Sequence, residues 1–244
     1  FQPKSIRKEP EIQEELKKLK PDFFVTFAFG QILSQDVLDI PKYETINLHA
    51  SLLPKYRGAN PIQRAIINGD TETGVCTMIT ELGLDCGDVC LKQVIPIPDT
   101  MNCEDLFSEI SSVSPELLEK TLTGLVDGVI KPVKQCEEGM CMANKLTKEE
   151  TVIDWAKTAR EIHNLVRGIY KFPSAHFMYN GKLIKVMQTK VVEGAGNPGE
   201  FVEVTKEGVK VACGKDCVLL IKVKPEGKGE MPARDWYNGV KKQV

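Results

Sequence analysis

The sequence predicts an α/β domain built on a mostly parallel sheet, followed by a smaller domain that is mainly β. Helix-like and strand-like segments alternate over residues 9–127, as expected where helices connect parallel strands. Residues 22–29 form a continuous aromatic and β-branched run ending at Gly30, which indicates a strand buried on both faces of a parallel sheet. From residue 182 onward, short alternating runs are separated by Gly, Pro and Asn turns, which is typical of a small β-barrel or sandwich.

The elements of the first domain follow from apolar spacing. Ile12, Leu16 and Leu19 fall on one stripe of a helix over residues 9–20, and Pro21 ends it. After the strand at 22–29, the expected elements are a strand at 45–49, a helix at 61–69, strands at 73–80 and 88–97, and a helix at 103–127.

The second domain is expected after a polar stretch. Residues 136–150 look like a linker, and residues 153–168 predict a helix with apolar Ile162, Leu165 and Val166. The short strands expected in the tail lie at 183–192, 199–204, 209–212 and 218–223. We therefore expect domains at residues 1–130 and 150–244, joined by residues 131–149.

Composition and charge support a folded chain with two unlike parts. Among 244 residues, 42% are hydrophobic and 27% are charged, which excludes disordered and low-complexity classes. The net charge is -2, but residues 171–244 carry 13 Lys and Arg against 8 Asp and Glu. The remaining 19 basic and 26 acidic residues lie in residues 1–170. This asymmetry indicates domains with different partners, although a lysine-rich solvated surface has the same charge.

Cysteine spacing and hydropathy limit the other classes of function. The eight cysteines form no C-x-x-C pair and have no nearby histidine to complete a zinc site, so we expect no metal. Scattered thiols in a chain without a signal peptide indicate a reducing compartment, either bacterial cytoplasm or an organelle matrix. No apolar run approaches the ~18 residues of a membrane helix, so we expect no membrane association.

Candidate catalytic residues lie where strands end. Asn47 and His49 are separated by one residue at the end of the strand at 45–49, so their side chains share a face. Asp85 lies between Gly83 and Gly87, which allow an unusual backbone conformation. An amide, an imidazole and a carboxylate can stabilise an oxyanion and move a proton, as group transfer requires. A strand-end histidine, a turn-forming asparagine and a capping aspartate would fit the same spacing.

Several separated motifs together resemble one known family. Residues 46–58 read Ile-Asn-Leu-His-Ala-Ser-Leu-Leu-Pro-Lys-Tyr-Arg-Gly, and residues 83–88 read Gly-Leu-Asp-Cys-Gly-Asp. These motifs resemble those of the folate-dependent formyltransferases, most closely those that act on methionyl-tRNA. The resemblance continues at residues 61–66, 144–155, 162–168 and 224–228.

The resemblance implies both a fold and a reaction. The implied fold is a Rossmann-like formyltransferase domain followed by an OB-like β-barrel that binds tRNA. The implied reaction transfers the formyl group of 10-formyltetrahydrofolate to the α-amino group of initiator methionyl-tRNA. Its product, N-formylmethionyl-tRNA, serves translation initiation.

The resemblance also assigns roles to individual residues. Asn47, His49 and Asp85 match the family's catalytic residues, and Ser51, Leu52, Leu53 and Pro54 match its folate-binding turn. The basic second domain would contact tRNA through Lys182, Lys185, Lys190, Lys222, Lys224 and Lys228.

Alternatives remain for the acceptor and for activity. Family members have further α/β units before the matched region, so we expect that the first part of the N-terminal domain precedes Phe1. We expect a monomer. One alternative is a formyltransferase acting on a nucleotide-linked amino sugar, and another is an inactive tRNA-binding fragment.

Overall fold

A computed structural model describes residues 1–241, which form two compact units. The first unit comprises Phe1–Ile62, Glu72–Pro96 and Phe107–Lys145, and the second comprises Gln63–Thr71, Ile97–Leu106 and the chain from Leu146 onward. No helix within residues 1–241 is long and apolar enough to cross a membrane.

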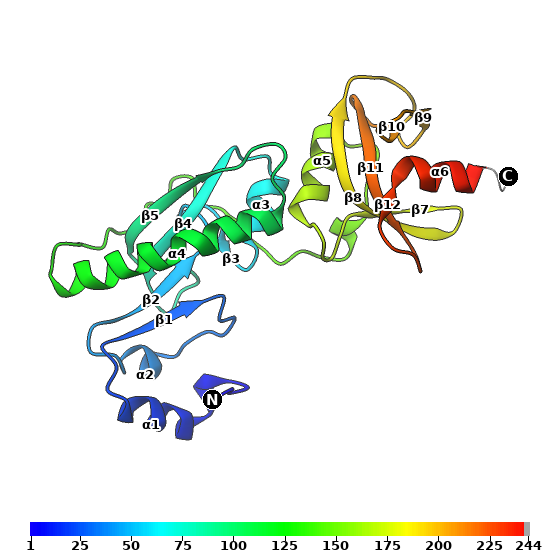
Figure 1. Cartoon of the computed structure of the whole chain (residues 1–244). Coiled ribbons are helices and arrows are strands. Elements are labelled where there is room, and N and C mark those ends of the chain that lie inside the picture. Colours follow the sequence, from blue (N-terminus) through cyan, green and yellow to red (C-terminus); the bar gives the residue numbers. More distant parts are fainter. Residues whose placement is uncertain (242–244) are drawn as a thin grey trace. The chain divides into compact units, whose positions relative to one another are not determined.

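The first unit is built on a four-stranded mixed sheet with strand order β1-β2-β4-β5 (Figure 1). These strands are β1 (Phe23–Phe27), β2 (Glu44–His49), β4 (Glu72–Ile79) and β5 (Val89–Pro96). Only β1 and β2 run parallel, because β4 is antiparallel to both β2 and β5. The expectation of a mostly parallel sheet is therefore corrected, since apolar strand patterns do not encode strand direction.

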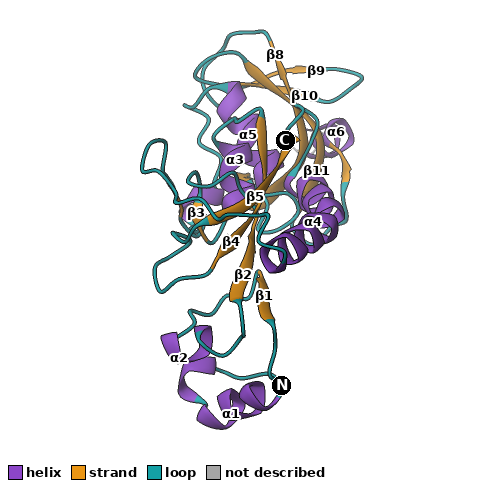
Figure 2. Ribbon diagram, turned by 90° about the vertical axis from the view of Figure 1, so that its left-hand side faces the viewer, coloured by secondary structure: helices purple, strands orange, loops and turns teal. Residues whose placement is uncertain are grey.

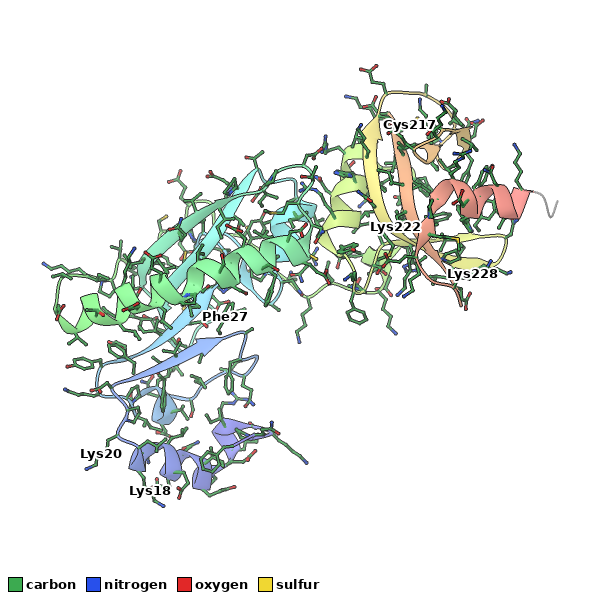
Figure 3. The ribbon with its side chains drawn as sticks, viewed as in Figure 1. Lys18, Lys20, Phe27, Cys217, Lys222 and Lys228 are labelled. Carbon is green, nitrogen blue, oxygen red and sulfur yellow. The ribbon has the colours of Figure 1, made fainter. Side chains whose placement is uncertain are left out.

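The edge strand β1 differs from its prediction. Val25 is 44% exposed and Phe27 is 38% exposed, so β1 is not buried on both faces. Among residues 1–241, β1 is an edge strand of this sheet and pairs with β2 alone. Phe27 (Figure 3) stacks on Phe107 of the long helix α4 (Cys103–Val126), with ring centroids 6.5 Å apart.

Helix α4 covers one face of this sheet (Figure 2). The hydroxyls of Thr121 on α4 and Thr77 on β4 are hydrogen bonded at 2.7 Å, and both side chains are fully buried. Leu106 and Ile110 are likewise fully buried. The other elements up to residue 151 are η1 (Ile6–Lys8), α1 (Pro10–Lys18), α2 (Gln35–Leu38), β3 (Arg57–Gly58), α3 (Pro61–Ile67), β6 (Met142–Ala143) and η2 (Glu149–Thr151).

In the second unit, helix α5 (Ala159–Gly168) begins later than predicted. The expected helix over residues 153–168 starts only after Thr158, whose side chain accepts a hydrogen bond from the backbone N–H of Glu161. Glu161 returns a hydrogen bond to the Thr158 backbone, completing a capping box. This local motif outweighs the apolar pattern that continues upstream.

The second unit also contains a six-stranded antiparallel sheet. Its main path is β7-β8-β11-β10-β9, and β12 also pairs with β11. The strands are β7 (His176–Tyr179), β8 (Lys182–Val192), β9 (Phe201–Val204), β10 (Val209–Ala212), β11 (Cys217–Pro225) and β12 (Met231–Pro232). Over residues 1–241 no ladder joins β7 to β9, so the sheet is a curled half-barrel and the closed OB-like barrel is not confirmed.

Aromatic side chains span the opening between β7 and β9. Tyr179 of β7 and Phe201 of β9 approach with ring centroids 5.2 Å apart. Helix α6 (Ala233–Lys241), which the sequence pattern did not predict, adds Trp236 and Tyr237 to this cluster. Packing of α6 therefore takes the place of a closing strand pair.

Candidate active site

Strand β2 carries two residues of the candidate site, Asn47 and His49. Asn47 lies opposite Thr26 in the parallel ladder with β1, and His49 lies opposite Cys76 of β4. His49 is buried with 5% exposure, whereas Asn47 is half-buried. Alternation along the strand puts both side chains on the same face, as the sequence predicted.

The imidazole of His49 is held by two neighbours. Its Nε2 lies 2.8 Å from the carbonyl oxygen of Tyr56, and its Nδ1 lies 3.7 Å from Oδ2 of Asp85. A carbonyl oxygen can only accept, so Nε2 must be the donor. Nδ1 is therefore the nitrogen that faces the carboxylate.

Asp85 reaches His49 from the loop between β4 and β5. Its φ of 48° lies in the left-handed region, as expected from the flanking glycines. Its Oδ2 accepts a 2.8 Å hydrogen bond from the backbone N–H of Gly58. The structure thus joins Asp85 to His49 across 36 residues of sequence.

Asn47 is oriented separately. Its Oδ1 accepts a 2.9 Å hydrogen bond from the hydroxyl of Thr26 on β1. This contact fixes the amide and leaves Nδ2 as its donor group. Within residues 1–241 no direct hydrogen bond joins Asn47 to His49 or Asp85, so the three residues share a region but not one network.

The turn after β2 is anchored by two buried side chains. Ser51 is fully buried and donates to the carbonyl of Lys55 at 2.6 Å, while Leu53 packs in a buried cluster. Leu52 and Pro54 remain half-buried, and the Leu53–Pro54 peptide bond is cis. The Ser51 backbone also has partners within the protein, since its N–H donates to the carbonyl of His49 and its carbonyl accepts from the thiol of Cys76.

Glycine at position 74 allows this turn to sit on the sheet. A Cβ at Gly74 would lie 2.6 Å from Cδ2 of Leu52 and 2.1 Å from the backbone oxygen of Gln93. Neither approach is possible for a real side chain, so β4 needs glycine beneath Leu52.

The neighbouring thiol is unsuited to nucleophilic catalysis. Cys76 is fully buried and donates to the carbonyl of Ser51 at 2.9 Å. Burial raises the pKa of the Cys76 thiol to about 11, so it stays protonated at neutral pH. No cluster of His, Cys, Asp or Glu suited to a metal ion was found within residues 1–241. The arrangement supports general acid-base chemistry with an amide donor.

Sequence reasoning missed two residues that support Asp85. Arg57 is buried, and both its Nε and Nη2 donate to Oε1 of Gln135. Gln135 in turn donates to the carbonyls of Asp85 and Gly87. Arg57 lies inside the motif at 46–58 and could have been singled out. Gln135 lies in a polar stretch and gives no sequence signal.

The chain matches two family descriptions over nearly its whole length. Formyl transferase matches residues 1–122, and Formyl transferase, C-terminal domain, matches residues 145–241. It is 42% identical over 241 residues to a protein from Clostridium novyi (strain NT) named methionyl-tRNA formyltransferase. A protein of the same name from Clostridium botulinum (strain Alaska E43 / Type E3) is 48% identical over 242 residues. Each alignment covers 98% of this chain and 78% of the relative.

Two solved structures share the fold at 22% sequence identity. HypX from Aquifex aeolicus in complex with tetrahydrofolic acid gives a TM-score of 0.71 over 96% of this chain and 42% of that chain. The N-formyltransferase from Helicobacter canadensis, with folinic acid and dTDP-3-aminofucose, gives 0.68 over 85% of this chain and 76% of that chain. Together with the family matches and the close relatives, this fold shows that the chain belongs to the formyltransferase family.

Proposed function

We propose that this protein transfers the formyl group of 10-formyltetrahydrofolate to the α-amino group of methionine on initiator tRNA. The single observation that carries this proposal is the identity of 42% to 48% with relatives named methionyl-tRNA formyltransferase. The product would be N-formylmethionyl-tRNA for translation initiation. The site geometry supports a transfer assisted by an amide, an imidazole and a carboxylate.

In the proposed reaction, the neutral amine attacks the formyl carbon and the carbonyl oxygen becomes an oxyanion. The Nδ2 group of Asn47 donates to that oxygen, because Thr26 already occupies Oδ1. The bond between the formyl carbon and the folate nitrogen then breaks. The amine loses one proton and the leaving nitrogen gains one.

His49 and Asp85 handle the proton in this proposal. The Tyr56 carbonyl holds Nε2, so proton exchange takes place at Nδ1. The carboxylate of Asp85 lies 3.7 Å from Nδ1 and faces this nitrogen. It also accepts a proton from the attacking amine through a bridging water.

We propose that the turn Ser51, Leu52, Leu53 and Pro54 binds the folate. Ser51 and Leu53 anchor the turn through buried side chains, which leaves the exposed parts of Leu52 and Pro54 for the ligand. Lys92 donates to the carbonyl of Leu53 and holds it in place. A flat ring could lie against such a turn.

We propose that tRNA contacts lysines of β8, of β11 and of the segment after β11. Lys185 of β8 lies directly opposite Lys224 of β11, and like charges in such a pair repel. Figure 3 labels Lys222 on β11 and Lys228 beyond its end. A bound phosphate would relieve the repulsion between these lysines. The other proposed contacts are Lys182 and Lys190 at the two ends of β8.

We propose further that residues 1–130 form the catalytic domain, residues 131–149 a linker and residues 150–244 the OB-like tRNA-binding domain. The last three residues of that domain lie outside the described chain. The named relatives are bacterial, which supports a cytoplasmic location, with an organelle matrix as the alternative. We propose that the protein acts as a monomer.

An acceptor assay tests the proposed function. The protein is incubated with labelled 10-formyltetrahydrofolate and either initiator methionyl-tRNA or a dTDP-linked amino sugar. We expect label in the tRNA fraction only. Label in the sugar would support the activity that structural relatives are named for, and label in neither would support an inactive tRNA-binding protein.

A further inference from the structure

The side chain of Gln135 lies between two loops of the candidate active site. Its Nε2 donates to the carbonyl of Asp85 at 2.9 Å and to the carbonyl of Gly87 at 2.7 Å. Its Oε1 accepts from Nε of Arg57 at 3.0 Å and from Nη2 at 2.8 Å. Both amide hydrogens and both lone pairs are therefore used.

The loop that contains Arg57 touches both proton-handling residues. The carbonyl of Tyr56 binds Nε2 of His49, and the backbone N–H of Gly58 binds Oδ2 of Asp85. Gln135 bonds the side chain of Arg57, which lies between Tyr56 and Gly58 in the sequence. It thereby joins the loop that anchors His49 to the loop that carries Asp85.

The chain around Gln135 is fixed at both ends. Val133 exchanges two 2.9 Å backbone hydrogen bonds with Val89 of β5. Further along, β6 pairs with β3, so that Met142 lies opposite Arg57. Backbone pairing therefore fixes the chain on both sides of Gln135. This restricts the position of its side-chain amide.

Asp85 needs such support. Its φ of 48° is unfavourable for a residue with a side chain, so the surroundings must hold it. The hydrogen bond from Gln135 to the Asp85 carbonyl acts on the backbone that carries the carboxylate. A small displacement of that backbone would move the carboxylate relative to Nδ1 of His49.

We propose that Gln135 is a positioning residue that sets the place of the Asp85 carboxylate for formyl transfer, an inference that rests on the proposed function. Glutamate cannot replace it, because a carboxylate has no hydrogen to donate to the carbonyls of Asp85 and Gly87. Methionine has a similar length and forms neither set of hydrogen bonds. Both variants should release the Asp85 loop while leaving the substrate-binding turn in place.

The test is a double-mutant cycle on formyl transfer to methionyl-tRNA. Gln135→Glu and Gln135→Met should each lower kcat about 10- to 100-fold, since a displacement of ~1 Å in an active site can cost ~10². KM for each substrate should change less than about twofold, as expected for an effect on the reacting step. In an Asp85→Asn background the same changes should lower kcat less than about twofold, because the group they position is already lost.

Gln93→Glu is the matched control, because Gln93 is exposed on β5 and, within residues 1–241, its side chain bonds only to the neighbouring Val94 carbonyl. It should leave kcat unchanged. The inference would be overturned if the Gln135 variants had the kcat of the wild type. It would also be overturned if their losses in kcat added fully to the loss caused by Asp85→Asn. Failure of both Gln135 variants to fold while Gln93→Glu folds would also overturn it, since the amide would then be structural. An inactive wild-type protein would instead contradict the proposed function, and the inference with it.

Discussion

The Nδ1 atom of His49 lies 3.7 Å from Oδ2 of Asp85, while Nε2 of the same ring is held by the Tyr56 carbonyl at 2.8 Å. One nitrogen is therefore fixed as a donor and the other faces a carboxylate. The fold thus brings together two residues that are separated by 36 positions in the sequence, and Nδ1 is the ring nitrogen that faces the carboxylate.

Asn47→Ala should lower kcat about 10²- to 10³-fold, because it removes the amide that donates to the developing oxyanion. Thr26→Val removes only the hydroxyl that orients this amide, so its loss should be smaller, below about 10-fold. Steady-state formyl transfer measures both variants. Equal rates for Asn47→Ala and the wild type would contradict the proposed role of Asn47.

Gly74→Ala should destabilise the protein by about 1–3 kcal/mol, since the new methyl group would overlap Leu52 and the Gln93 backbone. It should also raise KM for the formyl donor, because Leu52 lies in the proposed folate turn. Gly229→Ala is the control, since a Cβ there meets nothing within 4 Å. Urea unfolding compares the stability of the two variants. Equal midpoints would contradict the prediction, because β4 would then accommodate a methyl group at position 74 without a loss of stability.

Stability should fall below about pH 6.5 because of His163 on α5. Burial is the main cause that lowers the pKa of His163, outweighing the hydrogen bond and charge of Asp99, which raise it. The unfolded chain, with an ordinary histidine pKa near 6.5, therefore takes up a proton first. Neutral His163 therefore contributes fully to the free energy of unfolding above about pH 6.5. This contribution is lost as the pH falls towards the lower pKa of His163 in the folded state.

The slope from this one group cannot exceed about 1.4 kcal/mol per pH unit. His163→Gln should reduce the slope of unfolding free energy between pH 7 and pH 5.5. The measurement is urea unfolding of both proteins across that range. An unchanged slope in His163→Gln would show that other groups cause the acid sensitivity.

The double variant with Lys185→Gln and Lys224→Gln should bind tRNA more weakly than the wild type. Its binding should also depend less on salt concentration. Each lost phosphate contact should reduce the slope of log K against log salt by about 0.7 to 1. Lys206→Gln, which removes an exposed charge from the turn between β9 and β10, is the control. Filter binding at several salt concentrations tests this, and identical slopes for all three proteins would exclude this face from tRNA binding.

The sequence predicted local elements better than their arrangement. Strands β2, β4, β5, β8, β10 and β11 appear close to their expected positions because their apolar runs are bounded by turn residues. The antiparallel direction of β4 depends on pairing with β2, which no local pattern records. Likewise, the late start of α5 depends on the Thr158 and Glu161 cap, and α6 is stabilised by Trp236 among aromatic residues of distant strands.

The candidate site shows the same division. Asn47 and His49 could be placed on one strand face from spacing, and Asp85 in a loop from its glycines. Their roles came from the family resemblance and remain proposals. Gln135 could not be found, because its role depends on four hydrogen bonds to residues 48 to 78 positions away.

The most direct measurement is the rate of formyl transfer from labelled 10-formyltetrahydrofolate to initiator methionyl-tRNA by the wild type and His49→Ala. His176→Gln, which changes a histidine of strand β7, serves as the control. We expect transfer by the wild type and the control, and a loss of at least about 10² in His49→Ala. Equal rates in His49→Ala and the wild type would contradict the assignment of this site.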